Sequence, residues 1–242
     1  NSQDDAAKYT ASCKKNRKGN LSLYERIAKK RLSIYQGTAK KRLSIYKTTK
    51  QEIEKMIKTA LISVSNKEGI VNFARQLSKL GIKIISTGNP AKLLKNNKIK
   101  VTLVSEITKF PEMLDGRVKS VHPNIFAGIL ADRKSKKHIS ELKKLNIKPI
   151  DMVVINFYPF EGVFAKNAKL RKVIENIDIG GPALVRAAAK NYKDVLVIVD
   201  PSDYAVALEK IKNRRISDND RINLAAKAFS HTARYDTIIN NY

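Results

Sequence analysis

Residues 59–87 read TALISVSNKEGIVNFARQLSKLGIKIIST, and this stretch decides the class of fold. TALISVS (59–65) and IKIIST (82–87) are short apolar runs rich in β-branched residues, which is typical of buried strands. Between them, EGIVNFARQLSKL (68–80) has the character of a helix, and Gly81 follows where a helix stop is expected. A strand, a helix and a second strand in this order predict a parallel pair of strands.

Short apolar runs of the same kind recur further along the chain, and helical stretches lie between them. Alternating strands and helices predict an α/β domain with a mainly parallel sheet. In such sheets, ligands bind beyond the carboxyl ends of the strands, so the loops there are the first place to look for function. The further strands are expected at 100–104, 151–157 and 195–200, with a helix at 136–145 and two closing helices within 202–240.

The composition is that of a folded protein of 242 residues, since 43% of the residues are hydrophobic. No apolar run reaches membrane-spanning length, and the first residues, NSQDDAAKYT, lack the basic-then-apolar order of a secretory signal. A soluble, cytoplasmic protein is therefore expected. Cys13 is the single cysteine, which excludes an internal disulfide and a zinc site built from cysteines.

The formal net charge of +26 is concentrated at the front of the chain. Residues 1–58 carry 16 Lys or Arg and 5 Asp or Glu, and the other 184 residues carry 32 and 17. A strongly positive field attracts nucleic acid or phosphorylated metabolites. The alternative cause is coding bias, because lysine, asparagine and isoleucine are abundant together.

Residues 1–57 differ from the rest and contain an 11-residue duplication, because AKKRLSIY occurs at 28–35 and again at 39–46. We expect a basic extension here, helical or disordered, followed by one α/β domain over 58–242. The extension is interpreted either as an arm that contacts nucleic acid, an anionic membrane surface or a partner, or as a duplicated tail without a role.

Polar residues follow the first two predicted strands, where they form either ordinary helix caps or anion sites. Ser65 or Asn66 is expected to cap the helix that begins near Glu68. Gly88, in STGNP (86–90), would allow the backbone to approach a ligand closely.

Three later stretches also carry side chains suited to chemistry. In DGRVKSVHP (115–123), Arg117 and Lys119 would project the same way from an extended loop. NFYPF (156–160) ends the fourth strand, and NIDIGGPALVRAAAKN (176–191) joins an acid and two glycines to a cationic helix. The histidines show no metal-ligand spacing, and no dinucleotide fingerprint, phosphate-binding P-loop or nucleophile elbow is present. We therefore expect a site that uses lysine, tyrosine, aspartate and backbone amides, without metal or cofactor.

Long motifs of residues 58–242 occur in the order seen in one enzyme family. The chain resembles IMP cyclohydrolase, the N-terminal half of a bifunctional purine-biosynthesis enzyme whose other half is AICAR formyltransferase. The resemblance implies a three-layer, methylglyoxal-synthase-like fold, ring closure of formyl-AICAR to IMP with loss of water, no cofactor and a homodimer. The motifs are ALISVSNKEGIVNFARQL, STGNPAKLL, VSEITKFPEMLDGRVKSVHP, INFYPFEGV, ENIDIGGPALVRAAAKN, VIVDPSDY and AAKAFSHTARYD.

The same resemblance implies which residues act in catalysis. Lys119 would hold and polarise the reacting carboxamide and formyl groups. Lys190 would donate or accept the proton, in one hydrogen-bonded group with Asp178 and Tyr158. The implied nucleotide contacts are Ser65, Asn66, Lys67, Thr87, Gly88, Arg117, Val118, Lys119, Ser120, Asn156, Phe157, Asp178, Ile179 and Gly180.

The chain departs from the family pattern in three places. Gly88-Asn89-Pro90 replaces the usual Gly-Gly-Thr, which removes one glycine and one hydroxyl from the second loop. Residues 1–57 match no part of the pattern, and the chain stops at YDTIINNY, where the formyltransferase half would begin. A fragment and a stand-alone cyclohydrolase with a separate formyltransferase partner both remain open.

Two other functions are weighed against the cyclohydrolase. Methylglyoxal synthase shares the expected fold, but GRVKSVHP and IDIGGPALVRAAAKN match the cyclohydrolase. An inactive domain that binds nucleic acid through residues 1–57 would show salt-dependent binding that is lost without them.

Overall fold

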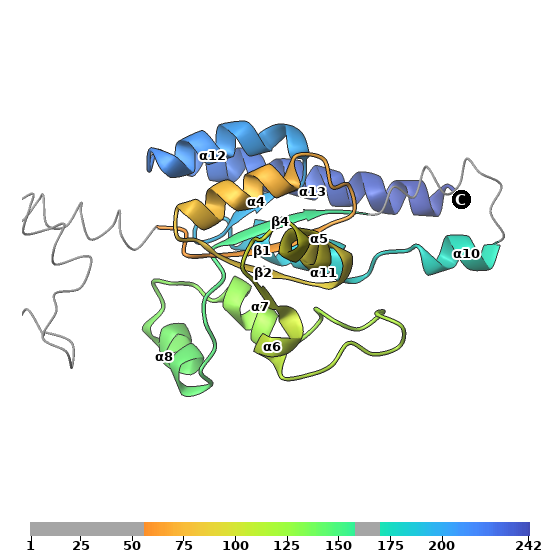
Figure 1. The fold of residues 1–242 in the computed structure, drawn as a ribbon, viewed down its shortest axis with the longest axis horizontal. Coiled ribbons are helices and arrows are strands. Elements are labelled where there is room, and N and C mark those ends of the chain that lie inside the picture. Colours follow the sequence, from red (N-terminus) through yellow and green to blue (C-terminus); the bar gives the residue numbers. More distant parts are fainter. Residues whose placement is uncertain (1–55, 158–169) are drawn as a thin grey trace, which may run out of the picture. The chain divides into compact units, whose positions relative to one another are not determined.

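A computed structural model describes residues 56–157 and 170–242, and its centre is a five-stranded parallel sheet in the order β3-β2-β1-β4-β5 (Figure 1). Every neighbouring pair of these strands is parallel, and Ala60 lies opposite both Ile84 and Met152. The mainly parallel sheet is therefore confirmed. The strands are β1 (Thr59–Val64), β2 (Lys83–Ser86), β3 (Val101–Leu103), β4 (Met152–Asn156) and β5 (Leu196–Ile198).

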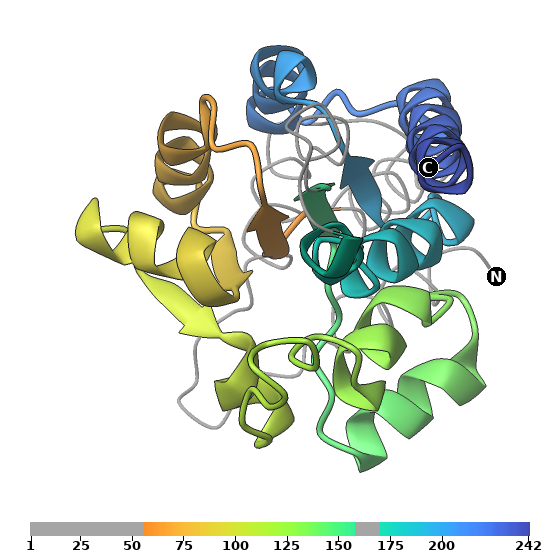
Figure 2. The ribbon, with the colours of Figure 1, turned by 90° about the vertical axis from the view of Figure 1, so that its right-hand side faces the viewer.

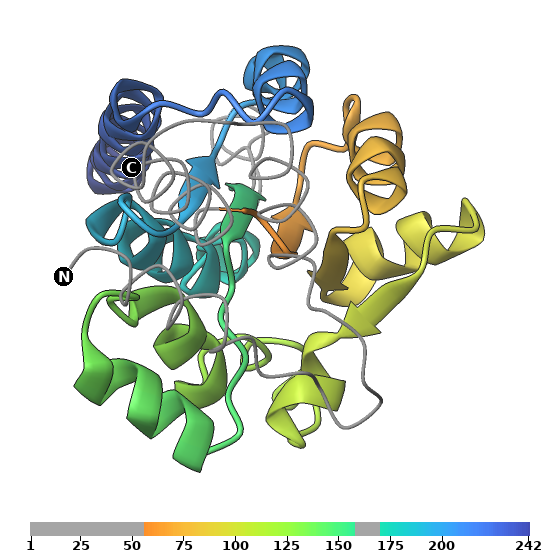
Figure 3. The same cartoon turned by 90° about the vertical axis from the view of Figure 1, so that its left-hand side faces the viewer.

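Helices cover both faces of the sheet, so the domain has three layers (Figures 2 and 3). One face is covered by α4 (Ile70–Lys79), α5 (Gly88–Asn96) and α12 (Tyr204–Lys212). The other face is covered by α6 (Val104–Thr108), α7 (Pro123–Leu130), α11 (Gly180–Lys190) and α13 (Asp218–Asn240). Three short elements complete the described chain: α8 (Lys136–Lys144), α10 (Leu170–Glu175) and the 3-10 helix η1 (Pro201–Asp203).

The strands are mainly apolar because both faces of the sheet are covered by helices. Along β1, Leu61 packs in the core on the α11 side, whereas Ala60 and Ile62 pack in the core on the α4 side. Side chains of a strand alternate between faces, so one continuous apolar run supplies two cores. This explains why the strands were recognisable in the sequence without any polar alternation.

The helix boundaries show which local signals were interpreted correctly. Gly81 follows the last turn of α4 with a φ of 80°, which confirms the expected helix stop. The predicted cap at the start of α4 is wrong, because Gly69 is the N-cap residue and no side chain caps the helix. Asn66 instead accepts a hydrogen bond from the Glu68 N–H through Oδ1, at 2.9 Å, which closes a local turn.

The basic extension lies outside the described residues apart from its last two positions, so the boundary at residue 57 stays a prediction. Both closing helices and the helix near 136–145 are confirmed as α12, α13 and α8. Within residues 56–157 and 170–242, no helix has the length and apolar character needed to cross a membrane.

Candidate active site

The loop after β1 is tied to the end of β4 by the side chain of Asn156. Its Oδ1 accepts the N–H groups of Ser65 and Asn66 at 2.7 and 2.9 Å, and its Nδ2 donates to the Asn66 carbonyl at 3.1 Å. Asn156 is only 7% exposed. The predicted substrate contact therefore organises this loop, and the N–H groups of Ser65 and Asn66 are not free to bind an anion.

The loop after β2 presents the open amino end of α5. Thr87 is the N-cap residue and its side chain does not cap the helix, and within residues 56–157 and 170–242 no side chain accepts a hydrogen bond from the N–H of Gly88 or Asn89. Pro90 stands third in α5 and has no N–H, so Gly88 and Asn89 are the donors of the first two positions. The amino end of a helix attracts anions, and of the two predicted anion loops this one keeps its amides available.

Lys119 reaches this helix end from the loop between α6 and α7. A Cβ placed on Gly88 would lie 4.0 Å from Nζ of Lys119, and one placed on Gly116 would lie 3.7 Å away. The loop is a tight turn, because Leu114, Asp115 and Gly116 all have positive φ values of 53, 53 and 85°. The structure thus places an ammonium group beside the free amides of α5.

The side chains of Arg117 and Lys119 do not point the same way. The prediction that they lie in an extended loop is wrong. The Arg117 guanidinium forms an exposed ion pair with Glu175 of α10, and its Nε donates to Glu175 Oε1 at 2.9 Å. Val118 pairs with Met113 in an isolated antiparallel bridge. The turn at 114–116 brings Val118 back beside Met113, and Arg117 and Lys119 on either side of Val118 have different neighbours.

Asp178 is held at the start of α11 by backbone hydrogen bonds. Its Oδ1 accepts the Gly181 N–H at 2.8 Å, and its own N–H donates to the Tyr235 hydroxyl at 2.8 Å. Burial raises the pKa of the Asp178 carboxyl above its ordinary value, while the Gly181 hydrogen bond and the positive charge of Lys119 oppose that rise. Lys119 is therefore near enough for its positive charge to act on the Asp178 carboxyl.

The two glycines after Asp178 leave room for this arrangement. A Cβ on Gly181 would overlap Asp178 Oδ2 and would lie 3.1 Å from Cδ1 of Phe157. A Cβ on Gly180 would lie 2.9 Å from Oγ of Ser120, so the turn of Ser120 packs directly against the start of α11. The loop after β2, Phe157 at the end of β4 and the start of α11 thus converge around Lys119 and Asp178.

An aromatic cluster behind Asp178 was not predicted from the sequence. Phe157 stacks on His231 with ring centroids 4.5 Å apart, and its ring lies 4.9 Å from that of Tyr235. His231 and Tyr235 are four residues apart in α13, so they lie on one helix face. Burial lowers the pKa of His231, which favours its neutral form. The spacing of FSHTARYD was the available signal.

Among the described residues, Lys190, Ile179 and Lys67 do not join the cluster. Lys190 is the last residue of α11 and is exposed, and ten residues separate it from Gly180. At 1.5 Å per residue it lies about 15 Å along the helix from the start of α11. Ile179 is the N-cap residue of α11 and is 68% exposed, and Lys67 is exposed. Tyr158 lies outside the described residues.

Comparisons with known proteins give a consistent family. Residues 69–183 match a family model described as an MGS-like domain, and residues 188–242 match one described as the AICARFT/IMPCHase bienzyme. The bifunctional purine biosynthesis protein PurH of Acetivibrio thermocellus is 57% identical over 189 residues, which cover 77% of this chain and 37% of that protein. PurH of Thermoanaerobacter sp. (strain X514) is 56% identical over the same shares. The chain belongs to the PurH family.

A solved structure supports the fold of this PurH-family chain. The crystal structure of ForH is 30% identical, covers 76% of this chain and 97% of its own, and superposes with a TM-score of 0.66. The MGS-like, three-layer α/β fold is therefore shown. The chain spans 37% of the length of the PurH relatives described above.

A hollow of about 420 Å³ opens next to the β1 loop of this PurH-family chain, on the side of α4 and α12. Asn66 and Ser202 line it, together with the stacked rings of Phe73 and Tyr204, whose centroids are 4.5 Å apart. Neither Lys119 nor Asp178 lines it. The hollow is therefore a second surface next to the predicted nucleotide loop, separate from Lys119 and Asp178.

Proposed function

We propose that this chain is an IMP cyclohydrolase, which closes formyl-AICAR to IMP with loss of water. Membership of the PurH family and the match to the AICARFT/IMPCHase bienzyme support this activity. The observation that carries the proposal is the convergence of the Lys119 ammonium, the open amino end of α5 and the half-buried Asp178 carboxyl.

The reaction forms one carbon–nitrogen bond and releases one water molecule. The carboxamide nitrogen attacks the formyl carbon, and two N–H protons leave with the formyl oxygen as water. A carboxamide nitrogen is a weak nucleophile, so the enzyme must orient the two groups and stabilise the oxyanion of the tetrahedral intermediate. It must also move protons between nitrogen and oxygen.

Lys119 and Asp178 supply these two functions in the proposal. The ammonium group of Lys119 stabilises the negative charge that develops on the formyl oxygen. The Asp178 carboxyl, which backbone N–H groups of Gly180 and Gly181 hold in place, accepts and returns a proton in this proposal. Its raised pKa brings the carboxyl nearer to neutral pH, where a group that exchanges protons is most effective.

The amino end of α5 is the proposed site of the 5′-phosphate. The free amides of Gly88 and Asn89 are suited to a phosphate, whereas the amides of Ser65 and Asn66 are bonded to Asn156. Thr87 and Lys67 stay candidate contacts from the neighbouring loops. Of the four catalytic residues that the family resemblance implies, the proposal assigns the chemistry to Lys119 and Asp178.

The partners of the reaction are part of the same proposal. A nucleotide substrate and an AICAR formyltransferase domain or chain fit the bifunctional relatives, and we also propose a homodimer and a cytoplasmic location. Nucleic-acid binding through residues 1–57 stays a separate prediction, since those residues lie outside the described chain apart from the last two.

The direct test is to incubate the purified chain with formyl-AICAR and to follow IMP by its absorbance and by chromatography. We expect IMP to form without added metal or cofactor. Folded protein that makes no IMP, or that makes methylglyoxal from dihydroxyacetone phosphate instead, would overturn the assignment.

A further inference from the structure

A second cationic feature lies on α8, away from the loops of the candidate active site. A hollow of about 400 Å³ opens between the segment before α8 and one face of that helix. In Figure 1, α8 lies at the left of the domain, whereas α10 and the loop that carries Lys119 lie to the right. The residues that line this α8 hollow are Arg133, Lys134, Lys136, Ile139, Ser140 and Lys143.

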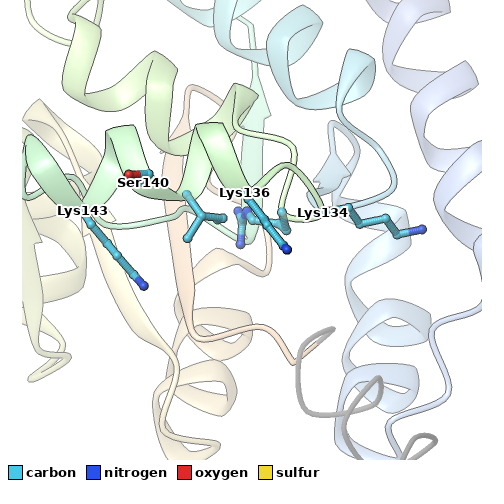
Figure 4. Close-up of a pocket in the computed structure, with 6 residues that line it drawn as sticks. Lys134, Lys136, Ser140 and Lys143 are labelled. Carbon is cyan, nitrogen blue, oxygen red and sulfur yellow. The ribbon is translucent and has the colours of Figure 1, made fainter.

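The sequence places these side chains on one surface by helix geometry. Lys136, Ile139, Ser140 and Lys143 follow the spacing i, i+3, i+4 and i+7, which is one face of an α-helix. Figure 4 shows Lys143, Lys136 and Lys134 in a row beside α8. The hollow is thus lined by a regular helix face, and its cations have fixed backbone positions.

The segment before α8 is held rigid by local hydrogen bonds. Ser135 caps α8 by accepting the His138 N–H at 3.3 Å, and Asp132 Oδ1 accepts the Lys134 N–H at 2.8 Å. The Asp132 N–H donates to Nδ1 of His138 at 3.2 Å. The backbone that carries Lys134 is therefore fixed relative to the helix that carries Lys136.

Arg133 forms the wall of the hollow, and its charge is already compensated. Its Nη1 donates to Asp151 Oδ1 at 2.7 Å, its Nη2 donates to the Ile150 carbonyl at 2.8 Å, and its backbone N–H donates to Asp194 Oδ2 at 2.9 Å. The guanidinium is therefore anchored to the segment just before β4. It shapes the hollow and leaves the binding of a ligand to the lysines.

The three lysines have no such compensation. Within residues 56–157 and 170–242, no ion pair is formed by Lys134, Lys136 or Lys143. The acidic side chains nearest in sequence are Asp132, which accepts the Lys134 N–H and forms no ion pair with the three lysines, and Glu141, which follows Ser140 on α8 and does not line the hollow. Like charges that share one hollow repel each other, and a polyanion would relieve that repulsion.

We propose that the α8 hollow binds a small polyphosphate, a compact ligand with several neighbouring phosphate charges. Three uncompensated ammonium groups and the Ser140 hydroxyl supply donors for phosphate oxygens. None of the lining residues in the described part of the chain is aromatic, so they offer no stacking platform of the kind that single-stranded nucleic acid uses. A strand of an acidic peptide spaces its same-side carboxylates about 7 Å apart, which suits an extended groove better than this hollow.

Isothermal titration calorimetry with sodium tripolyphosphate tests the proposal on the full chain. The loops beside α5 also attract phosphate, so the titration is done in a Lys119→Ala background and compared with the unmodified chain. We expect binding in both, weakened by a rise in sodium chloride because the contact is electrostatic. Loss of all binding in Lys119→Ala would place the ligand in the candidate active site and overturn the proposal.

Matched double variants then locate the site. Lys136→Ala with Lys143→Ala should raise the Kd for tripolyphosphate at least tenfold, whereas Lys136→Arg with Lys143→Arg should stay within about threefold. The control, Lys79→Ala with Lys212→Ala, removes two exposed charges from the ends of α4 and α12 and should change the Kd less than twofold. Equal weakening by the α8 and control pairs would reduce the effect to net charge and contradict a site.

A titration with an oligonucleotide distinguishes polyphosphate binding from nucleic-acid binding at the α8 hollow. A single-stranded decamer should bind no more tightly per phosphate than tripolyphosphate, and its binding should not depend on Lys136 and Lys143. Tighter binding of the decamer that the α8 double variant abolishes would overturn the choice of ligand. The outcome is independent of the proposed cyclohydrolase activity, since neither lysine lies in the candidate active site.

Discussion

The hydroxyl of Tyr235 accepts the backbone N–H of Asp178 at 2.8 Å, so the long helix α13 holds the turn that carries the proposed acid–base residue. The same ring lies against Phe157, which directly precedes the undescribed segment 158–169. Tyr235 is 6% exposed, and burial raises the pKa of its hydroxyl. A neutral, buried phenol therefore positions Asp178 without taking part in the chemistry.

Replacing Tyr235 by Phe should weaken the enzyme more than its small change in size suggests. The Asp178 N–H would lose its acceptor, and a buried unsatisfied N–H costs about 1–3 kcal/mol. We expect a lower free energy of unfolding in urea and a lower kcat, with a smaller change in KM. Tyr192→Phe is the control; equal effects of both substitutions on kcat would contradict a positioning role for Tyr235.

Gly181 should tolerate no side chain. A methyl group there overlaps Asp178 Oδ2 and presses on the Phe157 ring, so Gly181→Ala must displace the carboxylate. We expect cyclisation to fall by about a hundredfold or more, the scale of a lost acid–base group. At Gly180 the only close neighbour is the Ser120 hydroxyl, which can rotate away, so Gly180→Ala should be much milder in the same assay. The reverse order of severity would show that Asp178 is not where the activity lies.

Asp178 should make the folded state sensitive to pH in a direction unusual for an aspartate. Its folded-state pKa is raised by burial, so the folded state binds the proton more tightly than the unfolded state does. The ionised carboxyl therefore destabilises the fold at neutral pH, and this cost disappears as the pH falls below the ordinary pKa of about 3.8. Asp178→Asn should then be more stable than the parent at pH 7 and show no gain near pH 3.5.

Asp200 provides the control of opposite sign for that experiment. Lys227 holds the pKa of Asp200 at about 2, so its stabilisation is present above its ordinary pKa and is lost as the pH falls toward 2. Asp200→Asn should therefore lower stability at pH 7, by a small amount because the pair is solvent-exposed. Urea unfolding followed by circular dichroism at both pH values measures the two variants. A stability loss for Asp178→Asn at pH 7 would contradict the burial effect.

Restoring an N–H at position 90 should improve phosphate binding. Pro90→Ala and Pro90→Thr both return a third donor to the amino end of α5, and a hydrogen bond to a charged group contributes about 1.5–3 kcal/mol. We expect the Kd for IMP, measured by calorimetry, to fall by about tenfold in both variants. A lower Kd in Pro90→Thr alone would assign the effect to the threonine hydroxyl. An unchanged Kd in both variants would contradict the proposal that the phosphate binds at the amino end of α5.

The sequence predicted the sheet because each parallel strand is buried on both faces, and a run such as TALISVS records that burial directly. It also predicted that loops at the carboxyl ends of the strands would meet, and Gly88, Lys119 and Asp178 do. Local composition could not specify which amides stay free. That depends on Asn156, which lies about 90 residues from the loop that it binds.

The sequence also could not predict which way individual side chains point. Arg117 pairs with Glu175 of α10, whereas Lys119 lies near Gly88 and Gly116, and the two-residue spacing did not predict these different neighbours. Tyr235 reaches Asp178 across 57 positions, a long-range contact that no local pattern encodes. Lys190 shares a motif with Asp178, but 11 residues of regular helix carry it away from the cluster.

The central claim is that the chemistry rests on the Lys119–Asp178 pair, and the comparison of three variants in the formyl-AICAR cyclisation assay tests it most directly. Lys119→Ala and Asp178→Asn should each lower kcat by about a hundredfold or more, while Lys190→Ala, about 15 Å along α11, should stay within about tenfold of the parent. Circular dichroism confirms that each variant is folded. A large loss in Lys190→Ala, with Lys119→Ala close to the parent, would contradict the claim.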